Sequence, residues 1–141
     1  SLKITGILFA AFLIFGTACN KYEDGPKLSL RTKKARVSNT WELTSATDGD
    51  TDITTYTSGA TLKIEKDGNY ETGGSNDNVG NFSVTTGTWE FNDDKTKLIL
   101  TEKGATLPEK WTITRLKNDE LWLKKKQADD TYATQKFKGL D

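Results

Sequence analysis

The chain has 141 residues, with 20 Lys and Arg, 20 Asp and Glu, no His, four Trp and a single Cys. This length fits one domain. The absence of His excludes mechanisms that need an imidazole base or a His metal ligand. One Cys excludes an intrachain disulfide and a Cys-based zinc or iron–sulfur site. A net charge of zero argues against nucleic-acid binding through bulk electrostatics.

The chain opens with an apolar run over residues 4–18, which follows Lys3. A helix needs about 20 apolar residues to span a bilayer, so this run is short for a membrane anchor. A basic start, a short apolar stretch and small residues at its end are typical of a secretory signal peptide. We therefore expect residues 1–18 to be a signal peptide.

The run ends in Gly16-Thr17-Ala18-Cys19, which resembles a bacterial lipobox. The resemblance implies that Cys19 carries a lipid anchor and that the membrane is a partner of this protein. Two or more acyl chains hold a protein stably at a bilayer. The expected location is the outer membrane, with the domain either surface-exposed or facing the periplasm. Lys21 and the acidic residues after it resemble a surface-export signal and favour a surface-exposed domain.

Charge divides the remainder of the chain into a basic tether and an acidic body. Residues 20–38 hold six Lys or Arg and two acidic residues, whereas residues 39–141 hold thirteen Lys or Arg and eighteen acidic residues. We expect residues 19–38 to be the lipidated Cys and its tether. The stretch 31–36 either lies against anionic lipid headgroups or packs across one end of the domain as a helix or turn.

From residue 40 onward, apolar residues alternate with polar ones in short runs separated by turn signals such as Asp67-Gly68 and Asn92 to Lys95. Strands joined by such short turns pair antiparallel. The runs centre on residues 41–43, 62–64, 82–84, 89–91, 98–100, 111–113, 121–123 and 132–137. The pattern predicts an all-β fold, an up-and-down meander that closes into a barrel of about eight strands. A β-sandwich would need longer connections.

Several segments, in this order and spacing, resemble the lipocalin-like lipoproteins of Bacteroidota. They are residues 31–37, Trp41 to Leu43, Leu62 to Tyr70, Gly87 to Phe91, and the stretch from Leu116 to Leu123. The resemblance implies that residues 39–141 form a lipocalin-like β-barrel domain on a lipid tether.

Three indoles share a strand face with apolar neighbours, and these are Trp41, Trp89 and Trp111. Bulky aromatic residues of this kind either fill the interior of a small barrel or line a ligand cavity inside it. Trp41 lies at the start of the first strand, where we expect it to plug the closed end. Trp122 has the opposite parity to Leu121 and Leu123, so it points outward, either under the basic N-terminal segment or in a patch that binds a partner.

Three polar side chains complete the set of candidate ligand contacts. Arg115 has the parity of Trp111 and Ile113, which aims it inward. There it either lies over Trp41, as the resemblance to lipocalins implies, or pairs with an anionic ligand head. Tyr70 and Tyr132 are candidate hydroxyl partners for the same ligand.

Carboxylates are the remaining groups for catalysis, and most lie in turns, so we expect no enzyme activity and no cofactor. The segment from Asp48 to Asp52 has alternating acids, but Ile53 and Gly59 stand where a calcium-binding EF-hand loop needs Gly and Glu. We therefore expect no metal site. The favoured function is binding of a small apolar or amphipathic ligand. The alternative is a solid barrel that docks an envelope protein or a glycan near Trp122.

Overall fold

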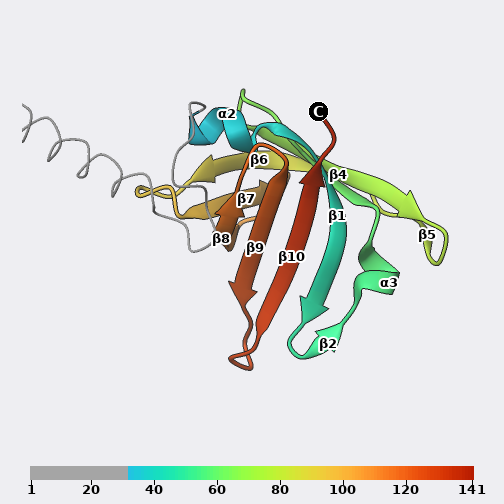
Figure 1. The fold of residues 1–141 in the computed structure, drawn as a ribbon. Coiled ribbons are helices and arrows are strands. Elements are labelled where there is room, and N and C mark those ends of the chain that lie inside the picture. Colours follow the sequence, from blue (N-terminus) through green and yellow to red (C-terminus); the bar gives the residue numbers. More distant parts are fainter. Residues whose placement is uncertain (1–31) are drawn as a thin grey trace, which may run out of the picture.

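Ten strands and two short helices make up residues 32–141, the part of the chain that the computed structural model describes (Figure 1). In chain order they are α2 (Lys33–Val37), β1 (Asn39–Asp48), β2 (Thr51–Asp52), α3 (Thr54–Thr57), β3 (Ala60–Ile64), β4 (Asn69–Asn76), β5 (Gly80–Asn81), β6 (Thr85–Phe91), β7 (Lys97–Glu102), β8 (Glu109–Leu116), β9 (Glu120–Lys126) and β10 (Tyr132–Gly139).

Eight of these strands close into an antiparallel barrel, which confirms the predicted fold class. The order runs β1, β3, β4, β6, β7, β8, β9, β10, and β10 then pairs with β1 from Gly139 to Ala133. Each strand therefore neighbours the next long strand in the chain, as in an up-and-down meander. The short strands β2 and β5 add to β1 and β4 outside this ring.

The predicted turns form through short-range polar contacts. Gly68 takes a φ of 98° between β3 and β4, a conformation that glycine adopts without strain. The side-chain oxygen of Asn92 accepts hydrogen bonds from the amides of Thr96 and Lys97 at 2.9 and 2.8 Å, which closes the turn between β6 and β7. These contacts fix the register of both hairpins, so that the alternating residues face the interior together.

The prediction of a strand over residues 82–84 is wrong. The chain leaves the ladder there, and Val84 is 68% exposed. The cause lies in β4, which pairs with β6 through Asn69 to Thr72 and then turns away to pair with β5. Gly74 takes a φ of 91° in this divergent half of β4, next to the Gly59 carbonyl. Phe82 thus lies in a loop at one end of the barrel.

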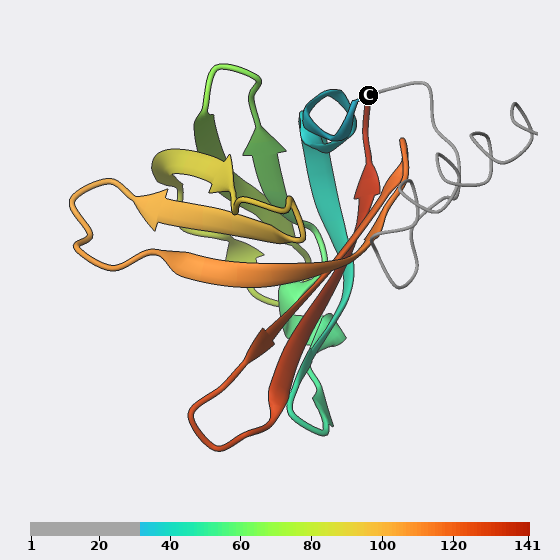
Figure 2. The ribbon, with the colours of Figure 1, turned by 90° about the vertical axis from the view of Figure 1, so that its left-hand side faces the viewer.

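Helix α2 packs across the end of the barrel where β1 begins and β8 and β10 end (Figures 1 and 2). Thr32 caps the helix by accepting a hydrogen bond from the Ala35 amide at 3.0 Å. Val37 is fully buried, and a guanidinium nitrogen of Arg36 donates to the Leu116 carbonyl at 2.9 Å. Residues 33–37 therefore pack across one end of the domain as a helix, which is one of the two arrangements expected for the basic stretch.

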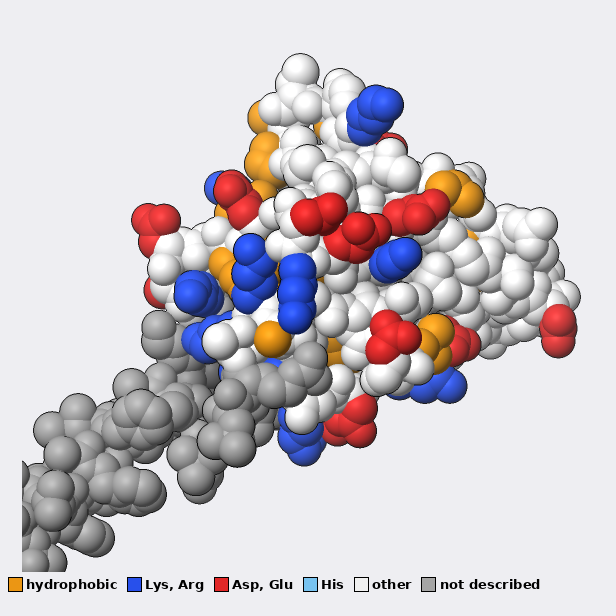
Figure 3. Space-filling view, turned by 90° about the horizontal axis from the view of Figure 1, so that it is seen from above, with side chains coloured by type: hydrophobic (Ala, Val, Ile, Leu, Met, Phe, Trp, Pro, Cys, Tyr) orange, Lys and Arg blue, Asp and Glu red, His pale blue; other side chains and the backbone are white. Residues whose placement is uncertain are grey.

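The barrel has a closed end at α2 and an open end at the opposite side. Figure 3 looks onto the closed end, where charged side chains of both signs surround small apolar patches. The loops after β7 and β9 project away from this end (Figure 2). Because the ring of strands is complete and encloses a packed core from Val37 to Phe137, we expect residues 32–141 to fold on their own.

Candidate functional site

The half of the barrel next to α2 is packed with buried side chains. Trp41 is 0% exposed, and its indole N–H donates to the Val37 carbonyl at 2.8 Å, which ties α2 to β1. Trp89 donates to the Glu65 carbonyl at 2.6 Å, and its ring meets Phe91 edge-on with centroids 5.3 Å apart. Both indoles are therefore packed and hydrogen-bonded within the core, where their role is structural.

The open half contains an apolar cavity of about 240 Å³ between β1, β3, β4, β7, β8 and β10. Its wall is mostly hydrophobic, and its polar groups are the amide of Gln135, the carboxylate of Glu109 and the hydroxyls of Thr61, Thr72 and Ser83. The main apolar lining residues are Leu43, Leu62, Phe82, Leu100, Trp111 and Phe137. Trp111 is thus the one of the three inward indoles that lines this cavity.

A second hollow of about 310 Å³ adjoins this cavity and leads to the surface. The two hollows share Thr72, Leu100 and Glu109. Tyr70 forms part of the wall of the second, and Leu107, which is 81% exposed, stands at its rim. Together the two hollows offer room for a ligand of modest size, with an apolar interior and a polar entrance.

Charged groups gather at the entrance around Trp111. The Glu109 carboxylate accepts a hydrogen bond from the Trp111 indole N–H at 2.9 Å and lies 3.7 Å from the Lys125 ammonium. That ammonium also lies 4.9 Å from the centre of the Trp111 ring. The Glu102 carboxylate lies on the same wall as Tyr70. The entrance therefore carries two carboxylates, and the Glu109 carboxylate is the one that lies near an ammonium group.

Tyr70 is buried against the backbone of Gly87, where a Cβ atom would come 2.6 Å from its ring. Burial raises the pKa of the Tyr70 phenol, and the negative charges of Glu102 and Glu109 raise this pKa further. The phenol is accordingly held in its neutral form, so that its hydroxyl can donate as well as accept a hydrogen bond. Tyr70 thus lies in the wall of the second hollow.

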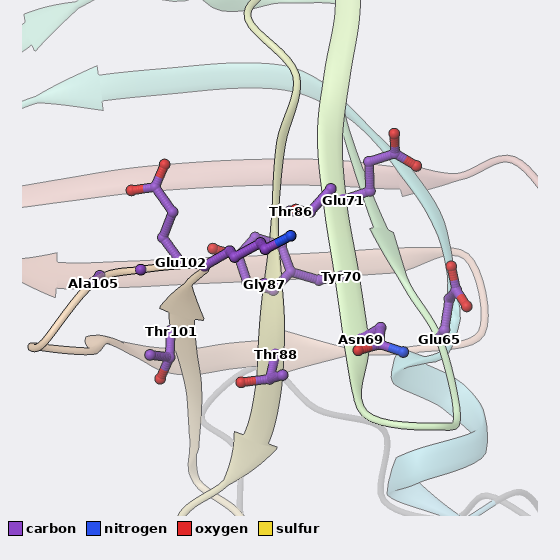
Figure 4. Close-up of a pocket in the computed structure, with 12 residues that line it drawn as sticks. Glu65, Asn69, Tyr70, Glu71, Thr86, Gly87, Thr88, Thr101, Glu102 and Ala105 are labelled. Carbon is purple, nitrogen blue, oxygen red and sulfur yellow. The ribbon is translucent and has the colours of Figure 1, made fainter.

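The outer side of the same wall carries a shallow hollow of about 520 Å³ across β4, β6 and β7 (Figure 4). Gly87 lies at its centre, with Thr88 and Thr101 beside it. The carboxylates of Glu65, Glu71 and Glu102 spread in different directions around this hollow and do not converge on one point (Figure 4).

Arg115 does not point inward, so this prediction is wrong. The register between β8 and β9 shifts between Ile113 and Arg115, because Thr114 is an extra residue in the ladder. Arg115 consequently faces out, 3.2 Å from the Glu120 carboxylate and with its guanidinium 4.6 Å from the centre of the Trp122 ring.

Trp122 points outward as predicted, but cations from the neighbouring strands lie over its ring. Arg115 on β8 and Lys136 on β10 are its partners in the ladders, and the Lys136 ammonium lies 4.0 Å from the ring centre. Tyr132 also faces out, 46% exposed, with the Lys124 ammonium 5.3 Å from its ring. Tyr132 therefore lies outside the cavity in which it was placed by prediction.

Two charged residues of the entrance, Glu109 and Lys125, were missed by the sequence analysis. Both have a parity that could have identified them, because Glu109 shares a face with Trp111, and Lys125 shares one with Leu121 and Leu123. Their contact joins β8 to β9 near the open end, where a charge can face inward and still reach water.

Three aspartates in turns accept hydrogen bonds from threonines two residues further along the chain. The hydroxyl and amide of Thr54 hold the pKa of Asp52 below its ordinary value, and Thr96 and Thr131 do the same for Asp94 and Asp129. Within residues 32–141, no group of three or more His, Cys, Asp or Glu is arranged to hold a metal ion. Neither helix in this part of the chain is long and apolar enough to cross a bilayer.

No family model matches this chain, and no curated protein matches it either. The predicted signal peptide and lipidated Cys19 lie outside the described residues, so both stay predictions.

Proposed function

We propose that this barrel is a binding protein without enzyme activity that takes one small amphipathic molecule into the hollows at its open end. The observation that carries the proposal is the unequal filling of the barrel. The closed half is packed around Trp41 and Trp89, whereas the open half leaves an apolar cavity beneath a polar entrance. A solid barrel would be filled along its whole length.

The lining suggests how the ligand would lie. Its apolar part would contact Leu43, Leu100, Trp111 and Phe137, where each buried CH₂ group contributes about 0.8 kcal/mol. Its polar head would remain at the entrance, near the charges of Glu102, Glu109 and Lys125. The volumes of the two hollows suit a medium-length chain or a small ring system rather than a large lipid.

The acidic residues support a role other than hydrolysis. Glycosidases need two carboxylates about 5–10 Å apart that face one bond. In the outer hollow the glutamates diverge, and at the entrance Glu109 is engaged by Trp111 and Lys125. Several aspartates accept hydrogen bonds within their own turns.

Titration with the neutral fluorescent amphiphile N-phenyl-1-naphthylamine tests the proposal. Thr72 lines both hollows, so Thr72→Phe should fill their junction and weaken binding about tenfold or more. Thr86→Phe is the matched control, because it adds the same ring to the exposed outer face of β6. The proposal fails if the unaltered barrel does not bind the probe, or if the two variants bind it equally well.

The expected anchor supports a place for this binding activity at the outer membrane, and it has a separate test. Cells that express the whole chain should incorporate labelled palmitate, and Cys19→Ser should abolish the label. Digestion of intact cells with a protease would distinguish a surface-exposed domain from one that faces the periplasm. Unchanged labelling of the Cys19→Ser variant would contradict the predicted anchor.

The alternative function, docking of an envelope protein or a glycan through Trp122, has weaker support. A sugar stacks on an open aromatic face, and the Trp122 ring already has the Arg115 guanidinium and the Lys136 ammonium over it. If the Trp122→Ala variant captures a defined partner as well as the unaltered protein does, this result would count against the alternative.

A further inference from the structure

The outside of the barrel has a strong charge asymmetry. On β8, β9 and β10, which the structure describes in full, the outward positions hold six Lys or Arg and one acidic residue, Glu120. We call this surface the basic face, and its cations are Lys110, Arg115, Lys124, Lys126, Lys136 and Lys138. The outward positions of β3, β4 and β6 instead carry Lys63 against Glu71 and Glu90.

Ion pairs reduce this charge but do not cancel it. Arg115 pairs with Glu120 at 3.2 Å, Lys126 with Asp130 at 3.4 Å, and Lys138 with Glu42 at 3.7 Å. When these three carboxylates are counted, the six cations still leave an excess of positive charge on the basic face. The whole domain is acidic, so this excess is a local arrangement and does not follow from composition.

A hollow of about 540 Å³ lies within the basic face, between β1, β8, β9 and β10. Ammonium groups, an indole and several hydroxyls line it, and Asp52 adds one carboxylate. The residues that matter here are Lys124, Lys136, Trp122, Thr47, Thr114 and Thr134. Ammonium and hydroxyl donors suit the oxygens of a phosphodiester. An aromatic ring among lysines with long apolar stems is typical of surfaces that meet a membrane interface.

The course of the chain brings its N-terminal side to the same part of the barrel. Helix α2 packs on the end of β8, where Arg36 donates to the Leu116 carbonyl at 2.9 Å. Lys33 and Lys34 on this helix add two further positive charges beside the basic face. Thr32, the first described residue, therefore lies at the end of the barrel where β8 ends, and a domain tethered on that side can turn the basic face toward the surface that holds the tether.

We propose that the basic face docks on an anionic phospholipid surface, with the barrel lying on its side. A lipid phosphate would occupy the hollow between Lys124 and Lys136, and Trp122 would lie at headgroup level. This role does not use the cavity at the open end, because none of the six cations of the basic face lines that cavity.

Vesicle co-sedimentation of residues 32–141 tests the proposal without a lipid anchor. Vesicles of equimolar phosphatidylglycerol and phosphatidylcholine should bind the domain at low salt, and pure phosphatidylcholine vesicles should not. Each cation near such a surface changes affinity about fivefold, so Lys110→Gln, Lys124→Gln and Lys136→Gln together should weaken binding about 100-fold. Added salt should weaken it as well.

A matched triple variant separates the basic face from net charge. Lys63→Gln, Lys66→Gln and Lys103→Gln remove the same charge from exposed positions on other parts of the surface, and they should change binding less than about threefold. Circular dichroism would confirm that both variants keep their strands. Equal losses in the two variants, or no binding to the anionic vesicles at low salt, would overturn the proposal.

Two further measurements identify the occupant and the orientation. If soluble dextran sulfate competes for the basic face and binds more tightly than the vesicles, the face recognises polyanions in general and the lipid proposal is wrong. Trp41, Trp89 and Trp111 are buried, so quenching by brominated phosphatidylglycerol should report on Trp122. Trp122→Phe should abolish the quenching and retain most of the binding, whereas unchanged quenching would contradict the docked orientation.

Discussion

Replacement of Trp41 by Phe should destabilise the barrel strongly, because Trp41 joins the core to the helix that closes it. The indole N–H donates to the Val37 carbonyl at 2.8 Å, and both residues are fully buried. Loss of this donor leaves a buried carbonyl without its partner, which costs about 1–3 kcal/mol. The smaller ring also leaves a void of about 40 Å³, which costs about 1 kcal/mol. The free energy of unfolding should therefore fall by about 3 kcal/mol.

Urea unfolding followed by circular dichroism measures this effect. With a denaturant slope of about 1.5 kcal/mol per molar, a loss of 3 kcal/mol lowers the midpoint by about 2 M. Trp122→Phe is the matched control, because it makes the same change on the outer face and should cost less than about 1 kcal/mol. Equal midpoints for the two variants would refute the reasoning that Trp41 links α2 to the core.

Three other predictions concern the wall and entrance of the cavity. Because the pKa of Tyr70 is raised above its ordinary value of 10.0, the native state keeps the phenol proton longer than the unfolded chain, and the free energy of unfolding should fall as pH rises beyond 10.0. Tyr70→Phe should reduce this dependence on pH, as measured by urea midpoints. A pH profile of the variant that matches the unaltered protein would contradict the prediction. Gly87→Ala would drive a Cβ atom into the Thr101 carbonyl and should lower the free energy of unfolding by about 2 kcal/mol or more, whereas Gly73→Ala, with its nearest neighbour atom at 3.7 Å, should cost much less in the same assay. In calorimetric titrations, dodecylamine should bind more tightly than dodecanoate. Glu109→Gln should reduce the ratio of the two affinities about fivefold. Tighter binding of dodecanoate would refute the charge assignment of the entrance.

Much of the fold follows from local sequence patterns. A strand period of two places alternate side chains on one face, so the inward positions of Trp41, Trp89 and Trp111 could be predicted. The Asp67-Gly68 turn could also be predicted, because its geometry depends on residues close in the chain. These short-range rules sufficed to identify an antiparallel barrel.

Long-range features could not be predicted in the same way. The extra residue at Thr114 reverses the direction of Arg115, and no local signal in the sequence marks such a bulge. The divergence of β4 toward β5 likewise removes residues 82–84 from the ladder. The cavity depends on how residues from six strands fill a common space, and composition alone does not determine that.

The positions of residues 32 and 141 have a practical consequence for assays. Both lie at the α2 end, since the amide of Asp141 donates to the Asn39 side chain at 3.2 Å and the amide of Leu140 to the Thr40 carbonyl at 2.9 Å. A fluorescent fusion or an immobilisation tag joined at either position would therefore be remote from the ligand entrance. A sensor surface built in this way should leave the ligand entrance at the opposite end of the barrel open to solvent.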